Sequence, residues 1–385
     1  MTSSNTTDSA VIRPRRHLPM AWLAVFAVAI VCLLIVVAWL LVTLQVSAIV
    51  MAIPALVPLA IVVSIIVWLD RWEPEPRILM ALALFYGAGA SILGTLVTGN
   101  FMLTVAARYL RTVGEVNTYA VVVQAPVIEE LIKGVGILVI LALARREFNG
   151  PVDGFIYGAL IGAGFAFTEN IVYFASAGDT GVSLVWVLVV RCILAPFAHV
   201  LFSGLIGIGV GWATRRTGIG RIVLGFLAGL LAAILTHAFW NGGSVLVLPM
   251  LGINPNNPVG WIAFYVLTQV PLFAACTWLV LRLIDDDRAA TRHRLREYTE
   301  AGWFTASELR MLTDLDNRAK ALAWARKRGA RAHRAMTGFI RDATRLAYAR
   351  EHASIDKKDP DRRIAERALL DEVLARRREL QEATE

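Results

Sequence analysis

Long apolar runs constrain this chain more than any other feature of its sequence. About eight runs each come near or exceed the ~20 residues that a helix needs to cross a bilayer. The chain is 57% hydrophobic and 18% charged, whereas soluble domains are roughly 45–50% apolar and about 25% charged. Because helices satisfy their own backbone polar groups in lipid, we expect an all-α polytopic transmembrane helix bundle. The runs cover about residues 20–44, 48–69, 78–106, 119–144, 152–175, 184–211, 222–248 and 259–283.

The arginines between the runs predict the orientation. On the side of the N-terminus the loops hold Arg13, Arg15, Arg16, Arg71, Arg77, Arg145, Arg146, Arg215, Arg216 and Arg221. The opposite loops hold only Arg108 and Arg111. Since cytoplasmic loops are rich in Lys and Arg, both termini of this multi-pass cell-membrane protein are expected to be cytoplasmic. The same bias accounts for the net charge of +8, so the lipid bilayer is an expected partner and nucleic acid is not.

The composition divides the chain into three parts. Residues 1–18 are polar and are expected to be a disordered cytoplasmic N-terminus, followed by the eight-span membrane domain at 19–283. Residues 284–385 are dense in Arg, Asp and Glu and predict a charged, helical, solvated cytoplasmic tail with little apolar material for a core. Within it, Thr305-x-x-Glu308 is a capping box that predicts a helix through about residue 328.

The fourth apolar run carries three charges near its middle. Glu129, Glu130 and Lys133 would each cost roughly 2.5–3.5 kcal/mol at that depth, so they need partners. Lys133 can reach either carboxylate on the same helix, at i,i+4 or i,i+3. Such an ion pair explains one glutamate but not comfortably two. Adjacent buried carboxylates with separated pKa values suit general acid–base chemistry.

The next three runs supply further polar groups. Glu169 lies in the fifth, His199 in the sixth, and His237 and Asn241 in the seventh at an i,i+4 spacing. Each taken singly could be an interhelical hydrogen bond. Together on consecutive spans, these groups favour a functional cluster.

The depth of each polar residue along its predicted span tests whether these groups can meet in the membrane. At 1.5 Å per residue, Glu129, Glu169 and His237 converge on the outer half of the membrane. His199 is calculated to lie deeper. Arg191, on the same span as His199, lies shallower and is expected to pair with a carboxylate or with Asp179 in the adjacent loop.

Two kinds of amide hydrolysis suit this set. Glu169, His199 and His237 could bind a divalent metal such as zinc, which takes His and carboxylate ligands. Alternatively, Glu129 or Glu130 activates water directly, Lys133 tunes the pKa values of the two carboxylates, and Asn241 donates to the oxyanion. The sequence lacks H-E-x-x-H and G-x-S-x-G, which excludes an ordinary zincin and the usual serine hydrolase.

These motifs, in this order on consecutive spans, resemble the PrsW family of intramembrane proteases, distant relatives of the CAAX-prenyl proteases. The resemblance covers a protease-like core at about residues 48–283. It rests on D-R-x-E-P-E-P from Asp70, E-E-x-x-K from Glu129, F-x-x-x-E-N from Phe165, His199, and H-x-x-x-N from His237. The CAAX-prenyl proteases differ in carrying a histidine in place of Glu169 and an arginine near the position of Lys133.

The resemblance implies that Glu129 and Glu130 are catalytic, with Glu169 and the two histidines completing the site of a metalloprotease. It also implies a single-pass membrane protein as substrate, such as a membrane-anchored anti-sigma factor cut on the extracytoplasmic side. Two other functional hypotheses remain open. The same buried groups could form a transporter or proton pathway, although no internal repeat supports it. The chain could also be a membrane scaffold whose tail recruits partners.

Overall fold

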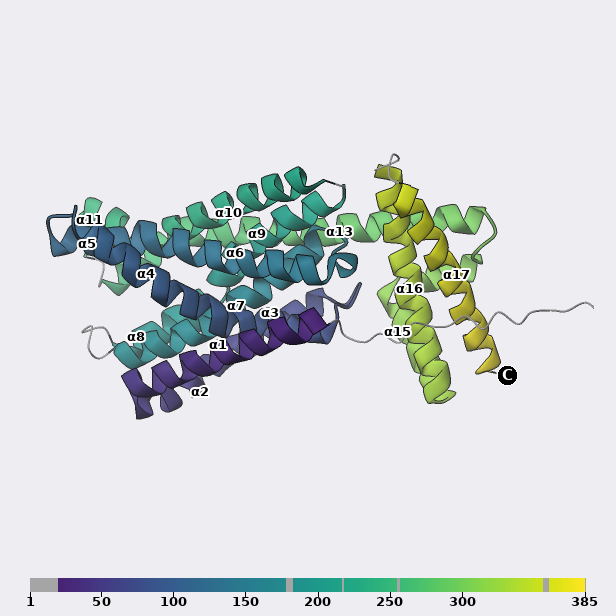
Figure 1. Ribbon diagram of the computed structural model, residues 1–385, viewed down its shortest axis with the longest axis horizontal. Helices are drawn as coiled ribbons and strands as arrows, with labels where there is room; N and C mark the ends of the chain where they lie inside the picture. Colours follow the sequence, from purple (N-terminus) through teal and green to yellow (C-terminus); the bar gives the residue numbers. More distant parts are fainter. Residues whose placement is uncertain (1–19, 178–182, 217, 255–256, 356–359, 385) are drawn as a thin grey trace, which may run out of the picture.

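The computed structural model describes residues 20–177, 183–216, 218–254, 257–355 and 360–384 (Figure 1). The regular elements in these ranges are all helical, which confirms the all-α prediction. The α-helices are α1 (Met20–Leu44), α2 (Val46–Leu69), α3 (Arg77–Phe85), α4 (Ile92–Ala106), α5 (Val113–Tyr119), α6 (Ala125–Leu143), α7 (Pro151–Ser176), α8 (Leu184–Leu188), α9 (Ala198–Thr214), α10 (Ile219–Gly242), α11 (Leu248–Met250), α12 (Pro258–Phe264), α13 (Val270–Glu300), α14 (Ala306–Leu312), α15 (Leu315–Lys327), α16 (Ala330–Ile355) and α17 (Pro360–Glu382). The predicted N-terminal segment, residues 1–18, lies outside the described residues.

Seven helical segments in the described ranges are long and apolar enough to cross a membrane. They are Met20–Leu44, Val46–Leu69, Arg77–Ala106, Pro151–Ser176, Leu184–Thr214, Ile219–Gly242 and Pro258–Glu300. The remaining predicted span is also helical, from α5 through a π-helical stretch at Ala120–Gln124 to α6. It differs from the seven by carrying Glu129, Glu130 and Lys133 near its middle. The bundle therefore matches the predicted polytopic architecture, with one span distinguished by its charges.

Helix α7 is the centre of the bundle and packs against α2, α3 and α9. Its glycines allow the backbone of α9 to approach closely. A Cβ at Gly158 would collide with the carbonyl oxygen of Ser203, and a Cβ at Gly162 would collide with that of His199. Small residues at membrane helix contacts permit this close approach. The glycines thereby place the start of α9 against the middle of α7.

The helix that leads into α9 is interrupted. A π-helical stretch, Val189–Leu194, is followed by three non-helical residues that include Pro196, and α9 then begins at Ala198. Proline lacks a backbone N–H and disrupts the helical hydrogen-bond ladder. The interruption leaves His199 in the first turn of α9, where its side chain reaches α6 and α7.

The tail has a core of its own, and the expectation that it lacks one was wrong. Helix α13 continues without a break past residue 284 and leads from the bundle to α15, α16 and α17 (Figure 1). Apolar residues from α13 to α17 form one buried cluster that includes Leu295, Leu312, Phe339 and Leu346. Helix α16 contributes seven of the thirteen buried residues, and the other helices contribute one or two each, so the charged composition concealed the core.

Several polar contacts join the tail to the loops of the bundle, including a hydrogen bond from Arg362 to the carbonyl oxygen of Arg215 at 3.0 Å. Arg318 donates to the carbonyl oxygen of Trp72 at 2.6 Å, and Arg345 pairs with Glu147 at 3.2 Å. His352 Nε2 lies 2.8 Å from the carbonyl oxygen of Asn149. These contacts fix the tail against the end of the bundle where α7 begins.

The capping box at Thr305 and Glu308 is present, as predicted. The helix that it opens is shorter than expected, because α14 ends at Leu312. Asp314 then caps a new helix, α15, by accepting from the backbone N–H of Asn317.

Candidate active site

The first turns of α6 supply the two glutamates and the lysine. Lys133 Nζ donates to Glu129 Oε2 at 3.3 Å and to Glu130 Oε1 at 2.8 Å. Glu130 and Lys133 are fully buried and Glu129 is 6% exposed. The i,i+3 and i,i+4 spacing predicted from the sequence therefore produces a three-residue charge cluster on one helix face.

Lys133 also contacts two residues of neighbouring helices. Its Nζ lies 3.1 Å from His199 Nδ1 and 3.7 Å from the centre of the Phe165 ring. An ammonium group has donors only, so His199 Nδ1 accepts and the proton of this imidazole is on Nε2. His199 Nε2 accordingly donates to Glu169 Oε2 at 2.8 Å. One ammonium thus fixes the tautomer and the orientation of His199.

The carboxylate of Glu130 accepts hydrogen bonds from three side chains. Besides Lys133, it accepts from Ser203 Oγ at 3.0 Å and from His237 Nδ1 at 3.0 Å. Because an ionised carboxylate only accepts, the proton of His237 is on Nδ1 and its Nε2 carries a lone pair. Within the described residues, His237 Nε2 has no hydrogen-bond partner. Glu130 therefore orients a histidine whose basic nitrogen is left available.

Glu169 is held by a second cation. Arg191 Nη1 pairs with Glu169 Oε2 at 2.5 Å, and the Arg191 guanidinium lies 3.7 Å from the centre of the Tyr173 ring. The expectation that Arg191 pairs with a carboxylate is thereby met on Glu169. The alternative partner, Asp179, lies outside the described residues.

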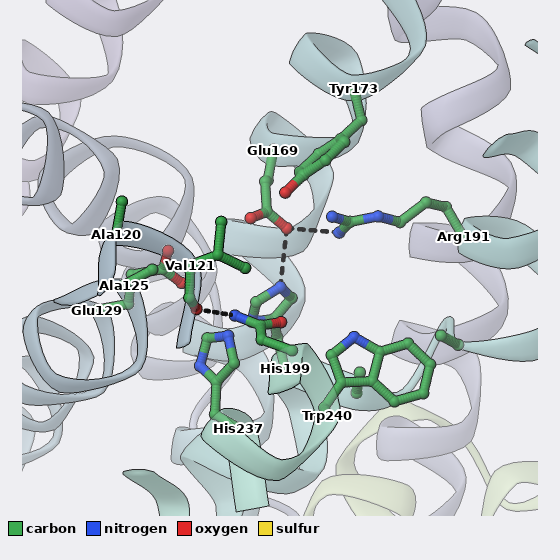
Figure 2. Close-up of a pocket in the computed structure, with 13 residues that line it drawn as sticks. Ala120, Val121, Ala125, Glu129, Glu169, Tyr173, Arg191, His199, His237 and Trp240 are labelled. Carbon is green, nitrogen blue, oxygen red and sulfur yellow. Dashed lines mark hydrogen bonds and ion pairs between the residues drawn. The ribbon is translucent and has the colours of Figure 1, made fainter. Parts of the chain in front are cut away.

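A cavity of about 130 Å³ opens beside these groups (Figure 2). Glu129, Glu169, Arg191, His199 and His237 line it, together with Ala120, Val121, Ala125, Tyr173, Ala195, Ala198, Trp240 and Asn241. Glu130 and Lys133 are not among the lining residues. The cavity exceeds the ~10–15 Å³ that one water requires, so it has room for water and part of a substrate.

The structure joins the residues that the sequence had grouped. Glu169 lies 18 residues, about 27 Å, along α7 from Pro151, which adjoins the contact between Asn149 and the tail. The site is therefore in the half of the bundle away from the tail. His199, which was calculated to lie deeper, contacts Glu169 and Lys133 directly.

Asn241 also lines the cavity, and its Nδ2 donates to the carbonyl oxygen of Val121 at 2.8 Å. This bond fixes the amide against the π-helical stretch that precedes α6. Its oxyanion role stays a prediction.

The sequence reasoning missed Ser203 and Tyr173. Ser203 lies four residues after His199, so the two share a helix face, and this spacing could have revealed it. Tyr173 bears the same relation to Glu169. Hydroxyl and aromatic residues are common in apolar runs, which made both positions inconspicuous.

Four donors could hold a divalent cation. One ligand atom from each of Glu129, Glu130, His199 and His237 lies within 4.8 Å of the others, and all four residues are buried. Carboxylate and imidazole ligands suit zinc and similar ions, so the residues fit in kind and in spacing. Lys133 contacts three of these residues, and a cation bound by all four would replace some of its contacts. Glu169, expected as a ligand, lies outside this group of four.

The fold and the site together define a polytopic membrane protein with a buried carboxylate–histidine centre. The family model described as PrsW family intramembrane metalloprotease matches residues 75–276, more than half of the chain, and the chain belongs to this family. The protein named Protease PrsW of Geobacillus kaustophilus is 33% identical over 89 residues, which are 23% of this chain and 36% of that protein. The chain thus spans about a third of that relative's length. No solved structure matches the chain.

Proposed function

We propose that the chain is an intramembrane peptidase that hydrolyses peptide bonds of membrane-anchored proteins. Family membership supports this function, and one observation carries it. Glu129 Oε1 and His237 Nε2 belong to residues that line the same cavity, and neither atom has a hydrogen-bond partner among the described residues. A carboxylate oxygen and an imidazole lone pair facing one space can position and deprotonate a water.

Glu129 is the proposed general base. It lines the cavity and keeps one oxygen open, whereas Glu130 is buried behind it and accepts from three side chains. The role of Glu130 is then to orient His237, as carboxylates behind reactive histidines do. Lys133 holds both carboxylates ionised, since they would otherwise repel each other in an apolar surrounding.

Arg191 and Asn241 are the proposed stabilisers of the oxyanion. Both line the cavity, and both present N–H donors. Donors that are already fixed in place stabilise developing charge without reorganisation. Arg191 is held by Glu169 and Tyr173, and Asn241 by the Val121 carbonyl oxygen.

A divalent metal is the proposed cofactor, in accordance with the family description. Glu129, Glu130, His199 and His237 would hold it, so the two glutamates would then be ligands instead of the base and the orienting group of the metal-free site. Glu169 would orient His199 through Nε2. When bound, such an ion polarises a carbonyl group and lowers the pKa of water. The glutamate-only mechanism is the alternative, and chelation separates the two.

The proposed substrate is a single-pass membrane protein, for example a membrane-anchored anti-sigma factor. Both termini are proposed to be cytoplasmic, because the arginine-rich loops lie on their side of the predicted spans. The tail then marks the cytoplasmic end of the bundle. The site lies in the opposite half, so cleavage is expected near the outer face of the membrane.

The test compares protein N-termini in membranes of cells that express the wild-type chain, Glu129→Gln, Glu130→Gln or Glu75→Gln. Glu75 is a matched control because it is also buried but does not line the cavity. We expect new N-termini in single-pass proteins with the wild type and Glu75→Gln, and none with the other two variants.

Identical N-termini in all four membranes, with every variant folded and equally abundant, would argue against proteolysis. Transport of ions through the purified chain would then be measured, because the same buried groups suit a proton pathway.

A further inference from the structure

A second cavity, of about 200 Å³, adjoins the candidate active site. It shares five lining residues with the first cavity, namely Val121, Tyr173, Arg191, Trp240 and Asn241. Its other lining residues are Val190, Trp261, Phe264 and Gln269. The two cavities therefore meet along one wall.

Gln269 is the unusual member of this second cavity. Its side chain is 1% exposed, yet neither Oε1 nor Nε2 has a hydrogen-bond partner among the described residues. A buried amide without partners costs free energy that folding does not recover. Buried polar groups are nearly always satisfied, and exceptions frequently have a functional reason. A ligand that supplies one donor and one acceptor would satisfy both atoms of Gln269.

The backbone around Gln269 is held in place. Gln269 ends a π-helical stretch, Tyr265–Gln269, and such stretches are frequent at functional sites. The Tyr265 hydroxyl donates to the carbonyl oxygen of Leu194, just before the interruption that leads to His199. Trp261 stacks on the Tyr265 ring, with 5.5 Å between the ring centres. The amide is thus fixed relative to the segment that carries a site histidine.

The rim shared by the two cavities faces outward. Val121 is 40% exposed and Tyr173 is 47% exposed, and both belong to predicted membrane spans. A segment of another membrane protein could therefore approach from the side. To be cut, such a segment has to unwind, which frees backbone N–H and C=O groups that cannot remain unpaired in an apolar surrounding.

We propose that the cavity lined by Gln269 binds the substrate segment next to the bond that is cut, with the Gln269 amide pairing with one unwound peptide group. Gln269 Nε2 donates to the substrate carbonyl oxygen, and Oε1 accepts from a substrate N–H. Trp240, Trp261 and Phe264 form the wall against which an apolar or aromatic substrate side chain packs. This inference rests on the proposed peptidase function and adds the recognition of an extended peptide.

The first experiment repeats the comparison of N-termini with Gln269→Leu and the matched control Thr268→Val. Thr268 is adjacent, does not line either cavity, and donates to its own helix at the Phe264 carbonyl oxygen. We expect Gln269→Leu to reduce cutting at the wild-type sites about tenfold or more, in line with the loss of buried hydrogen bonds. Thr268→Val is expected to remain within about twofold of the wild type.

The second experiment separates recognition from a structural effect. A synthetic peptide that contains the strongest cut site is compared with versions in which single backbone amides near the cut are replaced by esters, which lack the N–H donor. With the wild type, one ester is expected to lower kcat/KM about tenfold, mainly through KM. With Gln269→Leu, the same ester is expected to cause no further loss, because the acceptor is already absent.

The outcomes are distinguishable. Wild-type cutting by Gln269→Leu, or an ester effect of equal size in both proteins, overturns the subsite while leaving the peptidase intact. If the wild type cuts nothing, the proposed function fails and this inference fails with it.

Discussion

Two clusters of buried or partly buried carboxylates lie near opposite ends of α7, and they differ in their partners and in the space beside them. The site cluster (Glu129, Glu130 and Glu169) is paired with two cations that reach into it, Lys133 and Arg191. The junction cluster lies where the tail meets the bundle. It comprises Asp70, Glu75, Asp153 and Asp287.

Asp287 of the junction cluster pairs with Arg215 at 2.8 Å, whereas Asp70 and Asp153 accept from neutral backbone donors. Asp70 accepts from the backbone N–H of Glu75, and Asp153 accepts from those of Asn149 and Gly150. Burial raises the pKa of Asp70 to about 7 and raises the pKa of Glu75 well above its usual range. At neutral pH Asp70 is therefore only partly ionised, and burial favours the protonated form of Glu75.

The space beside the clusters also differs. The cavity at the site cluster measures about 130 Å³, whereas the one at the junction cluster measures only about 10 Å³. Both clusters contain a carboxylate paired with an arginine, so the volume of the adjoining cavity is the clearer difference between them. A buried carboxylate therefore indicates catalytic chemistry only when it also faces a space that a substrate can enter.

Replacement of Lys133 by Met should have the largest effect on stability. It leaves two buried carboxylates without their cation, and removal of one partner from a buried ion pair typically costs ~3–5 kcal/mol. The matched change in the junction cluster is Glu75→Gln, which replaces a carboxyl group whose neutral form is favoured by burial with a neutral amide, and it should cost less than about 1 kcal/mol. Denaturant unfolding of the purified proteins measures both; equal losses would remove the distinction between the clusters.

Shortening a glutamate by one methylene should lower turnover when the glutamate is in the site cluster and leave turnover nearly unchanged when it is in the junction cluster. Glu129→Asp moves the proposed base by about 1 Å, and a displacement of that size can lower turnover about 100-fold. Glu75→Asp should keep turnover per folded molecule within about twofold of the wild type. Initial rates on a substrate identified from its new N-terminus give the comparison, and an active Glu129→Asp protein would exclude Glu129 as the base.

Removal of metal should affect only the site cluster. We expect a chelator to lower turnover at least tenfold, with recovery when zinc is added back. Elemental analysis of the purified protein should show about one metal ion per chain in the wild type and in Glu75→Gln, and less in the double variant His199→Ala, His237→Ala. Full turnover by metal-free protein would instead support the glutamate-only mechanism.

The smallest effect concerns pH at the junction. Burial lowers the pKa of His352 from 6.5 to about 4, so the unfolded tail binds more protons than the folded one between these values. The stability of the tail should consequently fall as the pH drops from about 6.5 toward 4, by roughly 1 kcal/mol after solvent screening. Hydrogen exchange of α16 across this range measures it. His352→Gln should flatten the pH dependence, and an unchanged slope would assign it to other groups.

The membrane helices were predictable because their signal is local. Each apolar run predicts one membrane span from its own length and composition, independently of the other spans. The polar members of the site stood out for the same reason, since Glu129, Lys133 and Glu169 are costly in an apolar run. The tail was harder to predict, because its core consists of one apolar face of α16 and one or two residues from each of the neighbouring helices.

By itself, then, the sequence determined the all-α membrane architecture and the main polar residues of the candidate site. Only the tertiary structure decided which atoms remain open, because that depends on contacts between helices. In the folded chain Glu130 is hydrogen-bonded to Ser203 and His237, whereas Glu129 lines the active-site cavity. Gln269 lines the cavity that adjoins it. Hydrogen bonds between residues far apart in the chain have no period or spacing in the sequence, so they emerge only when the helices pack.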